Sequence, residues 1–206
     1  MPTTSMPSSL RLKVALVAVA ILVAPAASRA ESASFRLPEL GAIAIAAEGG
    51  HVRARRVPRP PALPSSRGES VAVDRRLTSE LRRAAQLMAV AGRGFTEHGR
   101  TFLLLGVAIP SVAKQGLGFC GAGTEDYLLL VEWMAGTRKL ELRDRVQVQS
   151  CLKPMVLQSD QGTDLRVVLG GIDDPANFRL TWLEHPAYGP GTKTLAVDNG
   201  KFVVLR

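Results

Sequence analysis

The sequence has little of the chemistry on which most enzymes depend. It contains only two cysteines and three histidines. None of the motifs G-x-S-x-G, H-E-x-x-H and C-x-x-C occurs, so the sequence signals of an α/β-hydrolase, a zinc protease and a thioredoxin-like oxidoreductase are missing. We therefore assign no catalytic residue, expect no resident metal or cofactor, and favour a binding role over an enzymatic one.

Long apolar runs are also lacking beyond the N-terminus. The one such run, residues 14–27, follows the positive charges of Arg11 and Lys13 and is too short to cross a bilayer. We expect residues 1–30 to be a signal peptide that is cleaved after Ala30; an uncleaved N-terminal anchor is the alternative. The mature protein is then predicted to be periplasmic or secreted, with no transmembrane span.

The two cysteines are predicted to pair, because the protein is expected to be exported. Cys120 precedes one predicted strand and Cys151 follows the next, so an antiparallel hairpin that turns near residues 135–136 brings them close together. Closing this loop of about thirty residues would stabilise the fold by roughly 3–4 kcal/mol. The alternative is a reactive Cys120 with His98 as its base.

The glycines around Cys120 form the pattern G-x-G-x-x-G between residues 116 and 121. A dinucleotide site needs a helix after this motif, since the helix N-terminus holds the pyrophosphate. Here the following segment, residues 126–133, has the apolar character of a strand. We therefore interpret the glycines as a turn around the disulfide and not as a nucleotide site.

Positive charge is concentrated in one part of the chain. The net charge is +8, and residues 51–100 hold most of the excess arginine, whereas basic and acidic residues balance from Thr101 onward. An exported chain rarely meets nucleic acid, so we expect no nucleic-acid partner. An anionic envelope component would suit this segment, and a solvated arm is the alternative.

Prolines divide the exported part of the chain. Residues 58–70 are rich in proline, which favours an extended linker. Residues 31–69 are therefore interpreted as an arginine- and proline-rich arm or linker, with a short hairpin that turns at Gly49 and Gly50. Residues 70–206 are expected to form a single, mainly β domain.

The pattern within that domain predicts many strands and one helix. Apolar residues recur at helical spacing over residues 77–92, with arginines on much of the remaining surface. From residue 100 onward, short apolar segments are separated by turn signals. This predicts an antiparallel barrel or sandwich of about seven to eight strands with one amphipathic N-terminal helix. One such segment alternates strictly, with these residues on one face: Leu140, Leu142, Val146 and Val148.

Candidate binding residues lie in two segments next to predicted strands. Glu125, Asp126 and Tyr127 follow the glycine-rich turn. The other set is Trp182, His185 and Tyr188, in or beside the segment EHPAYGPG. Loops stiffened by proline and glycine often carry binding groups, and an exposed tryptophan would strengthen this interpretation. For the acidic residues, hydrogen bonding within their own turn is the alternative.

These observations predict an exported binding or interaction module, of the kind found among inhibitor and immunity proteins. Its partner would be another protein or an anionic envelope component. One alternative is an envelope-associated structural protein held by its basic N-terminal segment. Another is a small hydrolase that uses Cys120 or a carboxylate pair.

Overall fold

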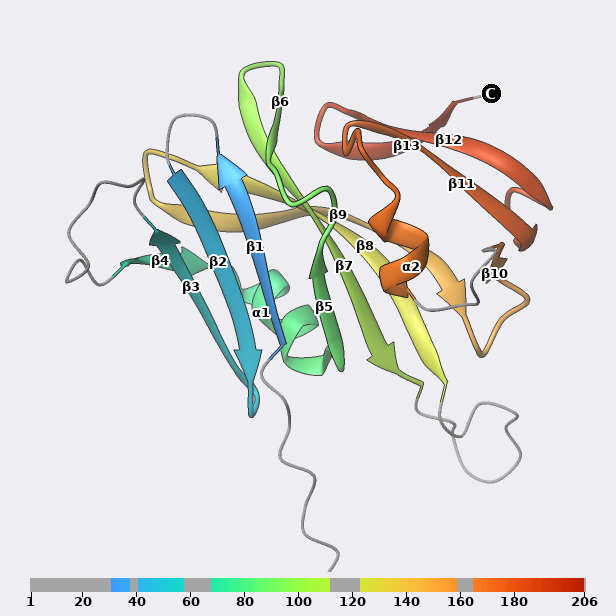
Figure 1. Cartoon of the computed structure of the whole chain (residues 1–206), viewed down its shortest axis with the longest axis horizontal. Helices are drawn as coiled ribbons and strands as arrows, with labels where there is room; N and C mark the ends of the chain where they lie inside the picture. Colours follow the sequence, from blue (N-terminus) through green and yellow to red (C-terminus); the bar gives the residue numbers. More distant parts are fainter. Residues whose placement is uncertain (1–30, 38–40, 58–67, 112–122, 159–164, 206) are drawn as a thin grey trace, which may run out of the picture.

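The computed structural model describes residues 31–37, 41–57, 68–111, 123–158 and 165–205, and it shows a mainly β protein (Figure 1). Three sequence predictions lie outside these residues: the signal peptide, most of the proline-rich linker and the surroundings of Cys120. Within the described part, no helix is long and apolar enough to cross a membrane.

The larger sheet forms a nearly closed barrel. Its strands are β1 (Glu31–Leu37), β2 (Gly41–Glu48), β3 (His51–Val57), β4 (Glu69–Val73), β5 (Gln86–Ala89), β6 (Phe95–Glu97), β7 (Arg100–Pro110), β8 (Thr124–Met134) and β9 (Lys139–Ser150). Eight of them follow one another in the order β1-β2-β3-β4-β9-β8-β7-β5, and β6 pairs with β7. Every pairing is antiparallel except that of β4 with β9.

Hydrogen bonds bring the two ends of this sheet together. The backbone N–H of Arg36 in β1 donates to the carbonyl of Gly92, just after β5, at 2.9 Å. The N–H of Gly94 returns a bond of 2.9 Å to the carbonyl of Arg36. Of the two predicted architectures, the barrel is therefore the one that this sheet adopts.

A helix, α1 (Arg75–Arg83), packs one face against the core of the barrel. Leu77 and Leu81 lie one turn apart on one face of α1 and are fully buried in the barrel core. Asp74 caps the helix, because its Oδ1 accepts from the N–H of Leu77 at 2.7 Å. Its Oδ2 accepts from the N–H of Leu142 in β9 at 2.6 Å, so the same carboxylate joins the helix to the sheet.

The predicted helix over residues 77–92 is wrong in its second half. The helix ends at Arg83, and Ala84 is already extended. Residues 86–89 form β5 and pair with β7, where Leu87 lies opposite Val107. The apolar residues at helical spacing favour a helix here, but pairing with the edge of β7 favours a strand. The strand forms because tertiary contacts outweigh local helix propensity.

Residues 31–57 were expected to form an arm, and they instead supply three strands of the barrel. The predicted hairpin at residues 49–50 is present as β2 and β3. However, Phe35, Ile43 and Ile45 point inward and are fully buried in the barrel core. The arm prediction is therefore corrected: arginines on alternate positions of β3 face outward, which is compatible with a strand that has one buried face.

A second sheet covers one outer face of the barrel (Figure 1). It consists of β10 (Val156–Leu157), β11 (Asn177–Glu184), β12 (Gly191–Asp198) and β13 (Lys201–Leu205), and a short helix, α2 (Leu165–Gly170), lies beside it. Its apolar side chains form a core with β7 and β8; this core includes Leu104, Ala108, Leu128, Phe178, Leu180, Trp182 and Leu195. Strands β7 and β8 are consequently buried on both faces, which explains their continuous apolar runs.

A β-bulge in β9 reverses the face that is buried. The register of the β8–β9 pair shifts between Leu130 and Val131. A shift of one residue moves the side chains that follow it to the opposite face of a strand, here as far as a second shift between Asp126 and Tyr127. The prediction that four residues share one face is therefore wrong: Leu140 and Leu142 lie in the barrel core, whereas Val146 and Val148 pack toward the second sheet.

Candidate functional site

The predicted hairpin between the two cysteine positions is confirmed. Strands β8 and β9 pair antiparallel, from Met134 opposite Lys139 to Glu125 opposite Ser150. Cys151 directly follows β9, at the strand end where β8 begins. Cys120 lies outside the described residues, so the disulfide stays a prediction.

Glu125 organises the turn at the end of this hairpin. Its carboxylate accepts hydrogen bonds from Ser111 Oγ at 2.9 Å, Ser150 Oγ at 2.7 Å, Cys151 N at 3.0 Å, Leu152 N at 3.2 Å and Gln147 Nε2. Partial burial by itself would raise the pKa of Glu125, but these hydrogen bonds to the ionised form outweigh it and lower the pKa. The side chain thus serves the fold, and little of it remains to bind a partner.

Asp126 points to the opposite face of β8, because consecutive strand residues alternate. It is 1% exposed and lines a cavity of about 550 Å³. Polar groups of Gln86, Gln149 and Ser150 share the lining with Asp126. Glu125 and Asp126, two of the predicted binding residues, therefore lie on different faces of β8 and do not act together at one site.

Tyr127 lies on the barrel side of β8 and packs against the barrel core. The guanidinium carbon of Arg145 lies 3.7 Å from the centroid of its ring, within cation–π range. Arg145 in turn contacts Glu80 of α1, with Nη1 and Oε1 2.8 Å apart. Tyr127 is therefore part of the contact between the barrel wall and α1.

Trp182 is buried, so it does not offer the exposed tryptophan that would have strengthened a binding role for this segment. It is 1% exposed, and its indole N–H donates to the carbonyl of Val148 at 2.8 Å. The alternation along β11 places Leu183 outside instead, with an exposed fraction of 54%. A recognition role for the segment after β11 must therefore come from other side chains.

His185 fixes the loop that follows β11. Its Nδ1 accepts from the N–H groups of Ala187 at 3.1 Å and Tyr188 at 3.0 Å. Its ring stacks on that of Tyr188, with centroids 4.2 Å apart, and meets Trp182 edge-on at 4.9 Å. Burial lowers the pKa of His185, which favours the neutral imidazole that these two hydrogen bonds require.

Tyr188 borders a surface hollow of about 830 Å³ between this loop and the ends of β12 and β13. We call it the Tyr188 groove; it is lined by Ala187, Tyr188, Thr192, Lys193, Thr194, Val204 and Leu205. Sequence reasoning found Tyr188 but missed Lys193 and the residues of β13. The dipeptide Asn199–Gly200 is a typical hairpin signal, and the hairpin places β12 beside β13. The groove forms only when the loop that carries Tyr188 packs beside these two strands, which the sequence does not indicate.

His98 lies far from the strand end where β8 begins. It occupies the turn before β7, whereas Pro110, at the other end of β7, pairs with Thr124. A strand of this length separates its ends by roughly 30 Å, and the chain from Gly123 to Cys120 can span at most about 11 Å. This distance argues against His98 as a base for Cys120.

No model of a known protein family matches this chain, and no curated protein is similar to it. The functional proposals below rest on the geometry of the described residues.

The role of Glu125 predicts a pH-dependent loss of stability in Glu125→Gln. At pH 7 we expect the variant to lose roughly 1–3 kcal/mol of unfolding free energy, because an ionised acceptor of several hydrogen bonds is replaced by a neutral one. The folded-state pKa of Glu125 lies below its ordinary value of 4.5. Its ionised form therefore stabilises the fold above that pH, and this contribution disappears as the pH falls through the folded-state pKa.

Urea unfolding of the two proteins between pH 7 and pH 3 measures this difference, which should shrink on acidification. Glu184→Gln, a change at an exposed carboxylate, serves as the matched control and should behave like the parent protein. A difference that stays constant or grows at low pH would contradict the role assigned to Glu125.

Proposed function

We propose that the protein is a binding module that captures another protein in the Tyr188 groove. The observation that supports this proposal is the rigid presentation of Tyr188 at the rim of a surface hollow. An aromatic side chain that is ordered before binding loses little conformational entropy when a partner binds. Such side chains supply a large share of the affinity in protein interfaces.

The loop that carries Tyr188 is held at several points. Besides the bonds to His185 Nδ1, the N–H of Gly189 donates to the carbonyl of His185 at 2.9 Å. Pro186 and Pro190 remove backbone freedom on both sides of the tyrosine. The ring of His185 supports one face of the Tyr188 ring, and Trp182 anchors both in the core. Binding would therefore not require this loop to reorganise.

The chemistry of the Tyr188 groove indicates the class of partner. Tyr188 and Leu205 offer apolar surface, and Leu205 is 49% exposed. Lys193 supplies a positive charge at the same place, and Thr192 and Thr194 supply hydroxyl groups. This combination fits a protein segment that presents an apolar side chain next to a carboxylate. Capture of a partner in the periplasm or outside the cell agrees with the expected export.

The proposal is tested by partner capture with Tyr188→Ala. The mature protein is immobilised, and the partner that it retains from the native envelope fraction is identified and purified. The dissociation constant of this partner is then measured with the parent protein and with each variant. Loss of a central aromatic side chain should weaken binding by roughly 30-fold. Leu183→Ala removes an exposed leucine of β11 that does not line the groove, and it should leave the affinity unchanged. Equal binding by Tyr188→Ala and the parent protein would contradict the proposal.

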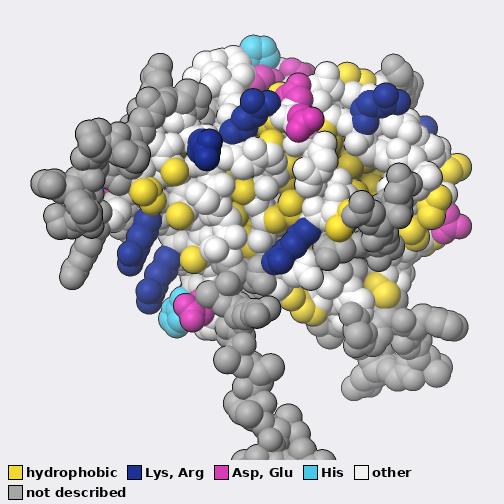
Figure 2. All heavy atoms as spheres, in the orientation of Figure 1, with side chains coloured by type: hydrophobic (Ala, Val, Ile, Leu, Met, Phe, Trp, Pro, Cys, Tyr) yellow, Lys and Arg dark blue, Asp and Glu magenta, His cyan; other side chains and the backbone are white. Residues whose placement is uncertain are grey.

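The outer face of the barrel favours a second function, attachment to an anionic envelope component. Across β1–β3 the outward residues form rows in which small side chains lie next to arginine: Ser34–Ala44–Arg55 and Ser32–Ala46–Arg53. Arg53 and Arg55 are exposed, and neither forms an ion pair with another residue in the described part of the chain. Figure 2 shows neighbouring basic side chains over this region of β2 and β3.

An exposed surface with two arginines about 7 Å apart fits a polymer or membrane with closely spaced negative charges. Removing the whole basic segment cannot test this function, because residues 31–57 are part of the barrel core. The double variant Arg53→Gln, Arg55→Gln leaves that core intact. It should bind vesicles rich in phosphatidylglycerol roughly 10- to 30-fold more weakly than the parent protein in a sedimentation assay.

The matched control is Arg75→Gln, Arg76→Gln, which removes two exposed arginines from α1 instead. This variant should bind the vesicles almost as the parent protein does. If both double variants lose affinity to the same extent, binding follows net charge alone, and the proposed surface on β1–β3 is wrong.

A further inference from the structure

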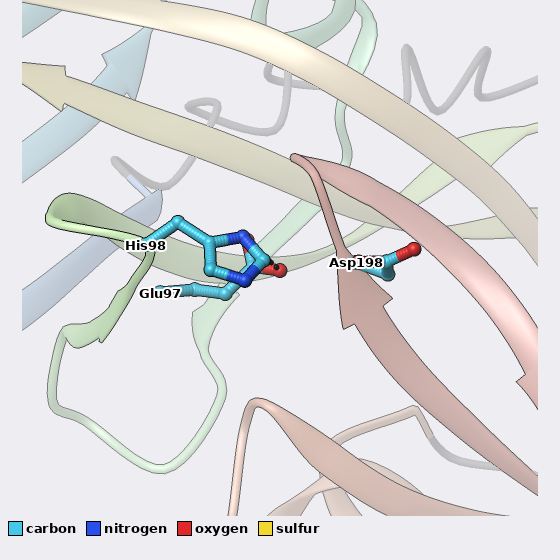
Figure 3. A group of neighbouring side chains, drawn as sticks. All are labelled: Glu97, His98 and Asp198. Carbon is cyan, nitrogen blue, oxygen red and sulfur yellow. Dashed lines mark ion pairs between the residues drawn. The ribbon is translucent and has the colours of Figure 1, made fainter.

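The tips of two hairpins, one from each sheet, meet at one end of the molecule. Glu97 is the last residue of β6 and His98 follows it in the turn to β7, while Asp198 is the last residue of β12, just before the turn to β13 (Figure 3). One ligand atom from each of these three side chains lies within 4.8 Å of the other two. Residues that are far apart in the sequence thus place an imidazole and two carboxylates around one point.

The position of Glu97 is fixed by the neighbouring hairpin. Its Oε1 accepts from the N–H of Asn199 at 2.8 Å, and its Oε2 accepts a longer bond of 3.4 Å from the N–H of Gly200. A carboxylate has about four lone-pair positions, so these two bonds leave room for a metal. Nearby, Arg100 donates to both oxygens of Glu132 at 2.9 and 2.6 Å, and it also interacts electrostatically with Glu97 without forming a hydrogen bond to it.

The spacing of the donor atoms suits a transition metal. Two ligand atoms at about 2.0–2.1 Å from a tetrahedral zinc ion lie roughly 3.4 Å apart. His98 Nδ1 and Glu97 Oε1 are 3.5 Å apart, close to that value. Asp198 lies within the 4.8 Å limit, and because its side chain is exposed, a change of rotamer can bring its oxygen closer without disturbing the core.

We propose that Glu97, His98 and Asp198 form a binding site for a divalent transition metal, with Zn²⁺ as the fitting ion. The mixed nitrogen and oxygen donors select such an ion over Ca²⁺ and Mg²⁺, which prefer oxygen ligands alone. Three protein ligands leave a coordination position for water. Because the ligands come from hairpins of both sheets, the bound metal joins the second sheet to the barrel.

No spacing in the sequence indicates this site, since Asp198 lies about a hundred positions from the other two ligands. The site is independent of the Tyr188 groove and of the arginines on β3, so neither proposed function has to hold for the metal site to exist.

Isothermal titration of the mature protein with ZnCl₂ at pH 7.5 tests the proposal. We expect saturable binding of a single ion to these three residues. His98→Ala and Asp198→Asn should each weaken that binding by at least about tenfold. His51→Ala serves as the matched control, because His51 is an exposed histidine at the β2–β3 turn, and it should leave the affinity unchanged. CaCl₂ should give no comparable binding.

A second measurement separates a specific site from an adventitious ion. Zn²⁺ should raise the melting temperature of the parent protein and of His51→Ala, since it binds the folded state, but not that of His98→Ala. All variants change exposed turn residues, and their melting temperatures without metal check that they fold. Absent binding to the parent protein, or equal zinc affinity in His98→Ala and His51→Ala, would overturn the proposal.

Discussion

The pairing of β7 with β8, buried on both faces, is the contact on which the rest of the structure depends. Leu103, Leu105 and Val107 of β7 point into the barrel, while Leu104 and Ala108 point to the second sheet. Each fully buried leucine contributes roughly 1.5–3 kcal/mol from the hydrophobic effect. Because one pair of strands serves two cores, the barrel, α1, α2 and the second sheet are energetically coupled through it.

Polar contacts define the two ends of this pair. At one end, the Glu125 carboxylate accepts hydrogen bonds from Ser150 and Cys151 and so holds the turn after β9. At the other, Glu132 is 5% exposed and accepts from Arg100 and Arg143. The hydrogen bond from Arg100 is the main cause that lowers the pKa of Glu132, against the opposing effect of burial. Removing either arginine would leave a buried carboxylate with fewer partners, which is destabilising.

Much of the β architecture could be predicted from the sequence. The turn at residues 49–50, the Asn199–Gly200 turn and the β8–β9 hairpin each have local signals, and each is present. The register shifts of the β8–β9 pair could not be predicted, because no residue type marks them. The conversion of residues 86–89 to a strand depends on the free edge of β7, which is again a tertiary contact.

The candidate sites, too, could be predicted only where neighbouring residues in the sequence form them. Sequence analysis selected Tyr188 and His185 from their loop, and the structure places them side by side. It also selected Glu125, Tyr127 and Trp182, whose polar or aromatic character is used within the fold itself. Lys193 and the trio around His98 were missed because each depends on residues that only the fold brings together. The arginines of β3 were recognised as a basic segment but were assigned to an arm and not to a barrel strand.

Hydrogen exchange of the full mature protein tests the central claim most directly, namely that residues 31–57 belong to one barrel organised around β7 and β8. Slow exchange marks amides that open only with the whole fold. We expect the slowest exchange in β7 and β8, and clear protection of the paired amides of β1–β3, because they contribute to the same core. Exchange of β1–β3 at the rate of an unstructured chain, with β7 and β8 still protected, would contradict this account.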